Sequence, residues 1–152
     1  LRVSHGPKLA LEDRADRQLA KELVSQLDPA TARELKDPAS FTADRMWIWR
    51  PIGNEELVAL SGCSGIARDP RCGILLARVL YGQPKLLTWA SSGSRLPLLH
   101  AHRSLRDIWL LSSDEMGLFT RRIGYAWGRI TVGEKERRVP RSVPQRRDKR
   151  RP

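Results

Sequence analysis

The last eighteen residues most limit what this chain can fold into, because they cannot contribute to an apolar core. Residues 135–152 hold nine basic side chains and two acidic ones, interrupted by Pro140 and Pro144. Proline opposes a regular helix, and a segment this charged cannot bury enough apolar surface to fold. The sequence therefore predicts one compact domain over 1–134, followed by a flexible, disordered, Arg-rich tail over 135–152.

The rest of the chain carries enough apolar material for one core. Hydrophobic residues make up 40% of the 152 residues and include five tryptophans, and a chain of this length is most simply one domain. The formal net charge is +11, of which the tail supplies 9 − 2 = +7, leaving 11 − 7 = +4 for residues 1–134. A basic tail on a mildly basic body is typical of proteins that bind polyanions.

Two helices are predicted in the N-terminal region. Apolar residues recur every four positions and indicate an amphipathic helix over 9–27. Asp28 and Pro29 suit the cap and the first turn of a second helix over 30–36. The predicted fold class is α+β, with an N-terminal helical hairpin packed on a small, mostly antiparallel sheet. The leucines expected to be buried in the first helix are Leu11, Leu19, Leu23 and Leu27.

Short apolar runs and turns alternate through the remainder of the chain. Aromatic and β-branched residues favour strands, whereas clusters of glycine and proline favour loops. The expected elements are a strand over 45–50, helices over 54–60 and 74–81 with a loop over 61–73 between them, a hairpin around 91–94, and a strand over 121–132.

Cys63 and Cys72 are the only cysteines, and two interpretations of them stay open. They are either small core residues or a disulfide, which would need an oxidising compartment. A structural zinc site usually needs four ligands, and the three histidines do not supply a recognised spacing. We therefore expect no metal and no cofactor.

The tail and one predicted strand supply the candidate nucleic-acid-binding residues. Arginine presents a planar set of donors that fits phosphate oxygens, and the counterions it displaces make such binding salt-dependent. On the strand, arginines flank Tyr125 and Trp127, which either stack bases on an exposed face or belong to the core. The same alternatives hold for Trp47 and Trp49 beside Arg45 and Arg50. The candidate residues are Arg121, Arg122, Arg129, Lys135, Arg137, Arg138, Arg141, Arg146, Arg147, Lys149, Arg150 and Arg151.

Part of the chain resembles a known enzyme family. Residues 60–103 contain Leu-Ser-Gly, Leu-Leu-Ala-Arg and Ala-His-Arg segments in an order similar to the signature region of ABC-transporter ATPases. The resemblance would imply ATP hydrolysis. However, Thr88-Trp89 stands where the family has its Asp-Glu pair, and the chain has no Walker A loop. Without these groups nothing neutralises the transferring phosphoryl group, so we assign no activity.

These features favour a binding protein over an enzyme. We expect a non-enzymatic nucleic-acid-binding protein, an RNA-binding component of a ribonucleoprotein such as a ribosome, with RNA favoured over DNA and with neighbouring proteins of the particle as further partners. The alternatives are a small DNA-binding regulator or viral accessory protein, and a small enzyme that uses His100 and His102 with Asp107 or Asp114.

The expected location is intracellular, in the cytoplasm or an organelle matrix, with the nucleus as an alternative. No apolar run approaches the roughly 20 residues that a helix needs to cross a bilayer. The sequence therefore predicts a soluble protein without a membrane partner.

Overall fold

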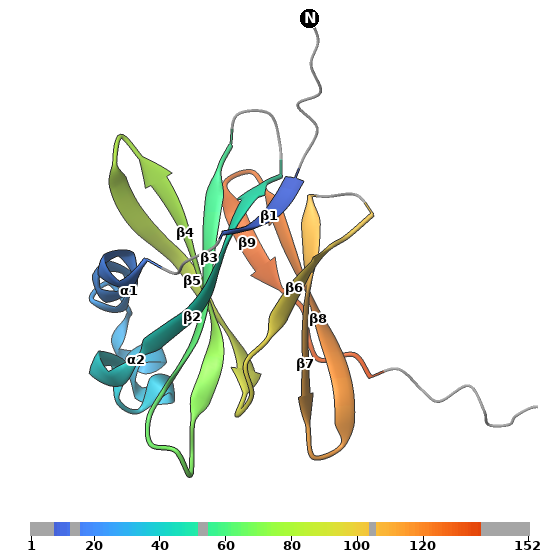
Figure 1. The fold of residues 1–152 in the computed structure, drawn as a ribbon. Helices are drawn as coiled ribbons and strands as arrows, with labels where there is room; N and C mark the ends of the chain where they lie inside the picture. Colours follow the sequence, from blue (N-terminus) through green and yellow to red (C-terminus); the bar gives the residue numbers. More distant parts are fainter. Residues whose placement is uncertain (1–7, 13–15, 52–54, 104–105, 138–152) are drawn as a thin grey trace, which may run out of the picture.

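The computed structural model describes residues 8–12, 16–51, 55–103 and 106–137, which form two antiparallel sheets packed face to face (Figure 1). The strands follow one another in chain order within each sheet. Sheet A consists of β1 (Lys8–Glu12), β2 (Thr42–Arg50), β3 (Leu57–Ser64), β4 (Arg71–Leu80) and β5 (Gln83–Gly93). Sheet B consists of β6 (Leu98–Ala101), β7 (Asp107–Asp114), β8 (Gly117–Ala126) and β9 (Arg129–Val132).

The described fold is mostly β, so the predicted α+β fold with a helical hairpin on a small sheet is wrong. The first part of the predicted helix over 9–27 is β1, which pairs with β2, and only α1 (Arg17–Val24) is helical. The Asp16 carboxylate caps α1 by accepting a hydrogen bond from the Leu19 amide at 3.0 Å. Leu23 is fully buried, whereas Leu11 lies on the edge strand β1 and is 54% exposed. The leucines of the predicted stripe therefore belong to different elements, Leu11 to β1 and Leu23 to α1.

Two of the predicted elements are confirmed. The second helix is α2 (Pro29–Leu35), with Asp28 at its N-cap and Pro29 in its first turn. The strand predicted over 45–50 is the second part of β2, and its tryptophans Trp47 and Trp49 point into the main core. A short 3₁₀ helix, η1 (Pro38–Ser40), links α2 to β2.

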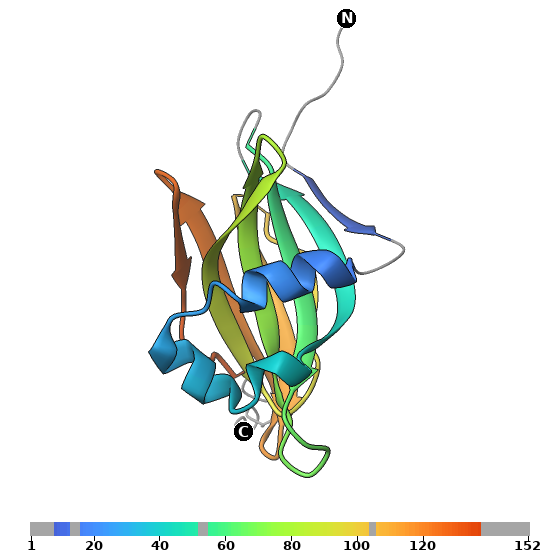
Figure 2. The same cartoon turned by 90° about the vertical axis from the view of Figure 1, so that its left-hand side faces the viewer.

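Sheet A is buried on both of its faces. Its inner face packs against sheet B, and its outer face lies under α1, α2 and η1 (Figure 2). Along β3, residues alternate between the two cores: Leu57 and Ala59 face sheet B, and Val58 and Leu60 face α1. A strand covered on both sides reads as an unbroken apolar run.

This double cover explains why the helices predicted over 54–60 and 74–81 are wrong: these stretches hold parts of β3 and β4. The loop predicted over 61–73 is too long, because both strands extend into it and only 65–70 connects them. A buried helix and a doubly covered strand give the same apolar run. Gly62 and Gly73, which suggested a loop, face each other across β3 and β4. A Cβ at Gly62 would lie 2.6 Å from the Phe41 ring, and one at Gly73 would lie 2.7 Å from the Trp89 ring. These glycines make room for aromatic rings.

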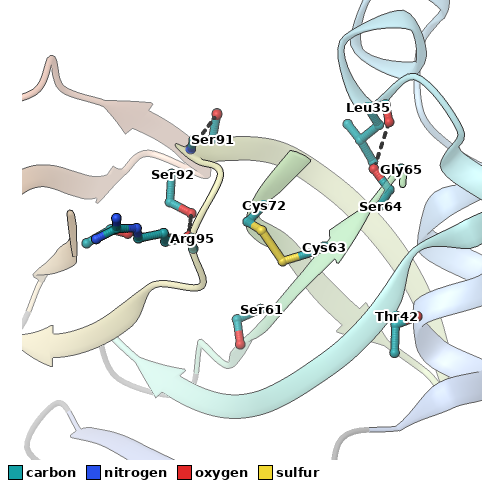
Figure 3. Close-up of a disulfide and its surroundings, with 12 residues drawn as sticks. Leu35, Thr42, Ser61, Cys63, Ser64, Gly65, Cys72, Ser91, Ser92 and Arg95 are labelled. Carbon is teal, nitrogen blue, oxygen red and sulfur yellow. Dashed lines mark hydrogen bonds between the residues drawn. A yellow bond between two sulfur atoms is a disulfide. The ribbon is translucent and has the colours of Figure 1, made fainter. Parts of the chain in front are cut away.

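Cys63 and Cys72 form a disulfide between β3 and β4 (Figure 3). The two residues are direct cross-strand partners, and the pair lies next to Gly62 and Gly73 in the register. Cys72 is buried, and Cys63 is partly exposed. Of the two interpretations of the cysteines, the structure thus supports the disulfide.

The C-terminal half differs from the prediction in how its strands are joined. The strands around 91–94, β5 and β6, lie in different sheets and do not form a hairpin. The strand expected over 121–132 is the end of β8, a turn at Trp127 and Gly128, and the whole of β9. Ile123 and Tyr125 point into the core, as the alternation along this segment indicates.

Candidate nucleic-acid interface

The outer face of sheet B is not covered by any helix among the described residues (Figure 1). Along β7, Ile108 and Leu110 are buried against sheet A, while Asp107, Trp109 and Leu111 alternate with them and are only partly buried. Sheet B therefore has one apolar inner face and one outer face that is open to a ligand, in contrast to sheet A.

Trp109 lies at the centre of this outer face, with polar neighbours on both sides. In the register its partners are His100 on β6 and Arg122 on β8. The Arg122 guanidinium carbon lies 6.0 Å from the centre of the Trp109 ring, and the His102 ring centre lies 5.3 Å from it. Asp107 holds Arg122 in place through a hydrogen bond of 2.6 Å from Nε to Oδ2. The result is an aromatic ring flanked by a fixed cation and an imidazole.

A shallow groove of about 560 Å³ crosses this face. It runs from β6 over β7 and β8 to the segment that follows β9, and Leu118 at its edge is 67% exposed. The residues that line it are His100, Trp109, Leu111, Leu118, Phe119, Thr120, Glu136 and Arg137. An apolar and aromatic floor with polar groups at the margins suits a flat organic ring that carries a charged group.

No family model, curated protein or solved structure matches this chain.

Arg121, one of the predicted contacts, points into the molecule and joins the two sheets. Its Nη1 donates to the Ser91 carbonyl of β5 at 2.7 Å, and its Nε donates to the Gly133 carbonyl at 2.8 Å. Burial lowers the pKa of the guanidinium, and the charge of Glu34 partly offsets this. These contacts give Arg121 a structural role between the sheets.

The other predicted cations on sheet B reach its surface. Arg122 lies on the outer face beside Trp109, with 49% of its side chain exposed. Arg129 begins β9, directly after the turn at Trp127 and Gly128, and is exposed. Of the aromatics in question, Tyr125, Trp47 and Trp49 belong to the core, and only Trp127 is exposed, at 97%.

The first residues of the predicted tail attach to the folded body. Glu136 pairs with Thr120, and each backbone amide donates to the other residue's carbonyl. Arg137 donates two hydrogen bonds to the Asp114 carboxylate, at 2.8 and 2.5 Å, and Lys135 donates a third at 3.2 Å. The remaining predicted contacts lie outside the described residues: Arg138, Arg141, Arg146, Arg147, Lys149, Arg150 and Arg151.

His100 and His102 lie close to Trp109, but the acids proposed to act with them are engaged elsewhere. Asp107 is ion-paired with Arg122, and Asp114 with Arg137. Among the described residues, no three His, Cys, Asp or Glu side chains gather in a way that could hold a metal ion. The stretch that resembles an ABC signature, 60–103, forms parts of β3 to β6.

Sequence reasoning missed Trp109, although a signal for it exists. The segment 107–112 alternates between Asp107, Trp109 and Leu111 on one side and Ile108, Leu110 and Ser112 on the other. This period of two predicts a strand with Trp109 on the less buried face. The identity of its neighbours, nine residues before and thirteen after in the chain, follows only from the strand register.

Proposed function

We propose that this protein binds single-stranded nucleic acid, with RNA favoured over DNA, on the outer face of sheet B. The observation that carries the proposal is Trp109 on an uncovered sheet face, with Arg122 and His102 against its ring. Every base has a flat π-face that stacks on an aromatic side chain, and arginine adds a contact to the base plane or to phosphate. Such stacking needs unpaired bases, which favours a single strand over a duplex.

The charge of the chain supports a polyanionic ligand. The net charge is +11, and seven basic residues follow Arg137 in the sequence. Arg137 lines one end of the groove, so the chain that carries these residues begins there. A strand whose bases stack on Trp109 would thus have its phosphates within reach of a basic segment, as in grooves that bind single strands with a salt-dependent affinity.

The test is binding of a fluorescent single-stranded RNA, measured by anisotropy at low salt, with the same sequence as single-stranded DNA and as duplex. Base–aromatic stacking contributes about 1–3 kcal/mol per base, so Trp109→Ala is expected to weaken RNA binding by roughly 5- to 150-fold. Arg122→Lys keeps the charge and is expected to weaken binding less than Arg122→Ala.

The matched control is Arg17→Ala with Lys21→Ala, which removes two exposed cations from α1 on the opposite side of the molecule. This variant is expected to keep most of the affinity. The proposal is wrong if no nucleic acid binds at low salt, or if Trp109→Ala binds RNA as the unchanged protein does. Tighter binding to duplex DNA than to either single strand would instead support the DNA-binding alternative.

A further inference from the structure

Two hairpins of this protein end in the same unusual turn. Tyr81 and Gly82 link β4 to β5, and Trp127 and Gly128 link β8 to β9. All four residues have positive φ: 52° and 78° in the first turn, and 56° and 75° in the second. A two-residue turn of this kind favours Asn, Asp or Gly at its first position, because a bulky side chain is disfavoured at positive φ. Both turns carry a large aromatic residue there.

Neither aromatic side chain packs against the protein in a way that would offset the unfavourable backbone conformation. Tyr81 is 101% exposed and Trp127 is 97% exposed. The aliphatic side chains just before Tyr81 are also open to solvent, with Leu80 49% and Val79 37% exposed. We call the ends of these two hairpins, residues 79–82 and 127–128, the tips. Unfavourable backbone conformations that place aromatic rings in full contact with solvent indicate a binding surface.

The two tips lie at the same end of the sandwich (Figures 1 and 2). Arg78 on β4 approaches the second tip, because a Cβ at Gly128 would lie 3.5 Å from its Nη2. The same guanidinium donates to the Tyr125 hydroxyl at 2.5 Å and pairs with Glu55 at 3.3 Å. This cluster joins the two sheets just behind the tips, so both tips stand on one rigid base.

The end of the sandwich that carries the tips also carries exposed cations that form no ion pair among the described residues. Three acids in the described part of this end are paired with arginines: Glu55 with Arg78, Glu56 with Arg50, and Asp107 with Arg122. The other exposed cations of this end have no ion pair within the described part of the chain; they are Lys85, Arg103, Arg106 and Arg129. The end that presents the aromatic tips therefore carries an excess of positive charge.

We propose that this end of the molecule docks on the surface of an anionic lipid bilayer. Tyrosine and tryptophan prefer the level of the lipid headgroups, where the ring is partly dehydrated and its polar atom stays hydrated. Leu80 and Val79 enter the acyl boundary beside them, and the surrounding cations bind headgroup phosphates. The exposed aliphatic residues favour a bilayer over nucleic acid, because a phosphate backbone offers them no apolar contact.

Such docking needs no membrane-spanning segment. No helix among the described residues is long and apolar enough to cross a bilayer. The sequence predicts no membrane partner because it lacks a long apolar run, but hydropathy along a chain cannot reveal two short tips that meet at one end of a fold. The contact proposed here is peripheral.

The test is sedimentation of the full chain with vesicles of phosphatidylcholine alone and of phosphatidylcholine mixed with phosphatidylserine. All proteins are compared as full chains at one moderate salt concentration, so that the attraction of the basic C-terminal segment is the same in each. The decisive variant is Tyr81→Asn with Trp127→Asn. Asparagine suits both turns better than an aromatic residue, so this variant should melt at the same or a higher temperature. We expect it to lose roughly tenfold or more in partitioning onto the mixed vesicles.

The matched control is Ile66→Ser with Met116→Ser, which removes two side chains that are 62% and 78% exposed in the β3–β4 loop and the β7–β8 turn, at the opposite end of the sandwich. It is expected to bind the mixed vesicles as the unchanged protein does. The proposal is overturned if the unchanged protein ignores the mixed vesicles, or if the tip variant binds them equally well. It is also overturned if the tip variant loses only RNA affinity, because the tips would then belong to the nucleic-acid surface. Trp109→Ala, which tests the proposed function, is expected to leave vesicle binding unchanged.

Discussion

Asp114 ties the start of the basic C-terminal segment to the folded body. Its carboxylate accepts hydrogen bonds from Arg137, from the Met116 amide and from Lys135. Arg137 makes the largest contribution, and together these donors hold the pKa of Asp114 far below the usual carboxyl range. Folding lowers the pKa of this carboxylate, so the carboxylate stabilises the native state at any pH above its pKa in the unfolded chain, near 3.9. The stabilisation is lost as the pH falls toward the pKa in the folded protein. The attachment is therefore intact at neutral and mildly acidic pH.

Asp114→Asn is expected to release the segment 135–137 without unfolding the protein. Trypsin should then cleave after Lys135 faster than in the unchanged protein, because the backbone around Glu136 no longer stays paired with Thr120. Glu115→Gln, a neighbouring exposed acid, is the control and should cleave at the original rate. The products can be identified by mass spectrometry, and equal cleavage rates in all three proteins would contradict the role given to Asp114.

At the scale of single elements, the sequence predicts those that carry a distinctive local signal and fails where an apolar run carries none. β2 is found because its aromatic and β-branched residues favour a strand, and α2 because Asp28 and Pro29 mark its start. β3 and β4 are missed because α1 and α2 cover the outer face of sheet A and leave no alternation to detect. That cover is a property of the folded molecule.

Because α1 is shorter than the predicted helix, two leucines of the same predicted stripe are expected to contribute differently to stability. Leu23 is fully buried between α1 and the outer face of sheet A, so Leu23→Ala is expected to lower the free energy of unfolding by about 2–5 kcal/mol. Leu11 lies on the edge strand β1 and is 54% exposed, so Leu11→Ala is expected to change it by less than about 0.5 kcal/mol. Urea unfolding measures both changes. Similar losses of unfolding free energy at the two positions would contradict the division of this region into β1 and α1 and would favour a single long helix.

The disulfide between β3 and β4 closes a short loop, since its cysteines are nine positions apart in the chain. In the chain-entropy model, a disulfide that closes a loop of this size raises the free energy of unfolding by about 2.5 kcal/mol, because it restricts the unfolded chain. Cys63→Ala with Cys72→Ala is expected to reduce the free energy of unfolding by this order.

Urea unfolding with and without a reductant measures this effect. The reductant should destabilise the unchanged protein and leave the double variant unaffected. Two free thiols in the purified native protein would contradict the pairing. Structural disulfides persist in oxidising compartments and are reduced in the cytosol, so the same measurement on protein from its native source would also test the expected intracellular location.

At the scale of the whole molecule, composition gives the charge of the interface, and only the fold gives its position. The basic segment is visible in the sequence, yet Arg121 turns inward while Arg122, the next residue, lies beside Trp109. Strand alternation separates these two arginines, but which face is open depends on where the helices pack. The groove gathers residues from β6, β7, β8 and the segment after β9, and no local pattern contains all of them.

Removing residues 138–152 is expected to weaken nucleic-acid binding and flatten its dependence on salt. The segment holds seven basic residues and one acidic residue, so the net charge falls from +11 by 7 − 1 = 6 to +5. If six of these cations reach phosphates, the slope of log affinity against log salt should fall by about 4 for a single strand. Replacing the seven basic residues with glutamine keeps the length and should have the same effect. Unchanged slopes in both variants would show that the folded body alone binds the strand.

The order of the strands has a consequence for synthesis on the ribosome. Within each sheet, every hydrogen-bonded neighbour is also the next strand along the chain, so each hairpin can close as soon as its second strand has emerged. The pairing of β1 with β2 waits for the helices between them, and the main core waits longest, because Trp49 meets Tyr125 only after β8 has been made. Until then the apolar inner face of sheet A stays exposed, which makes the half-made chain, rather than the finished protein, the form that most needs protection from aggregation.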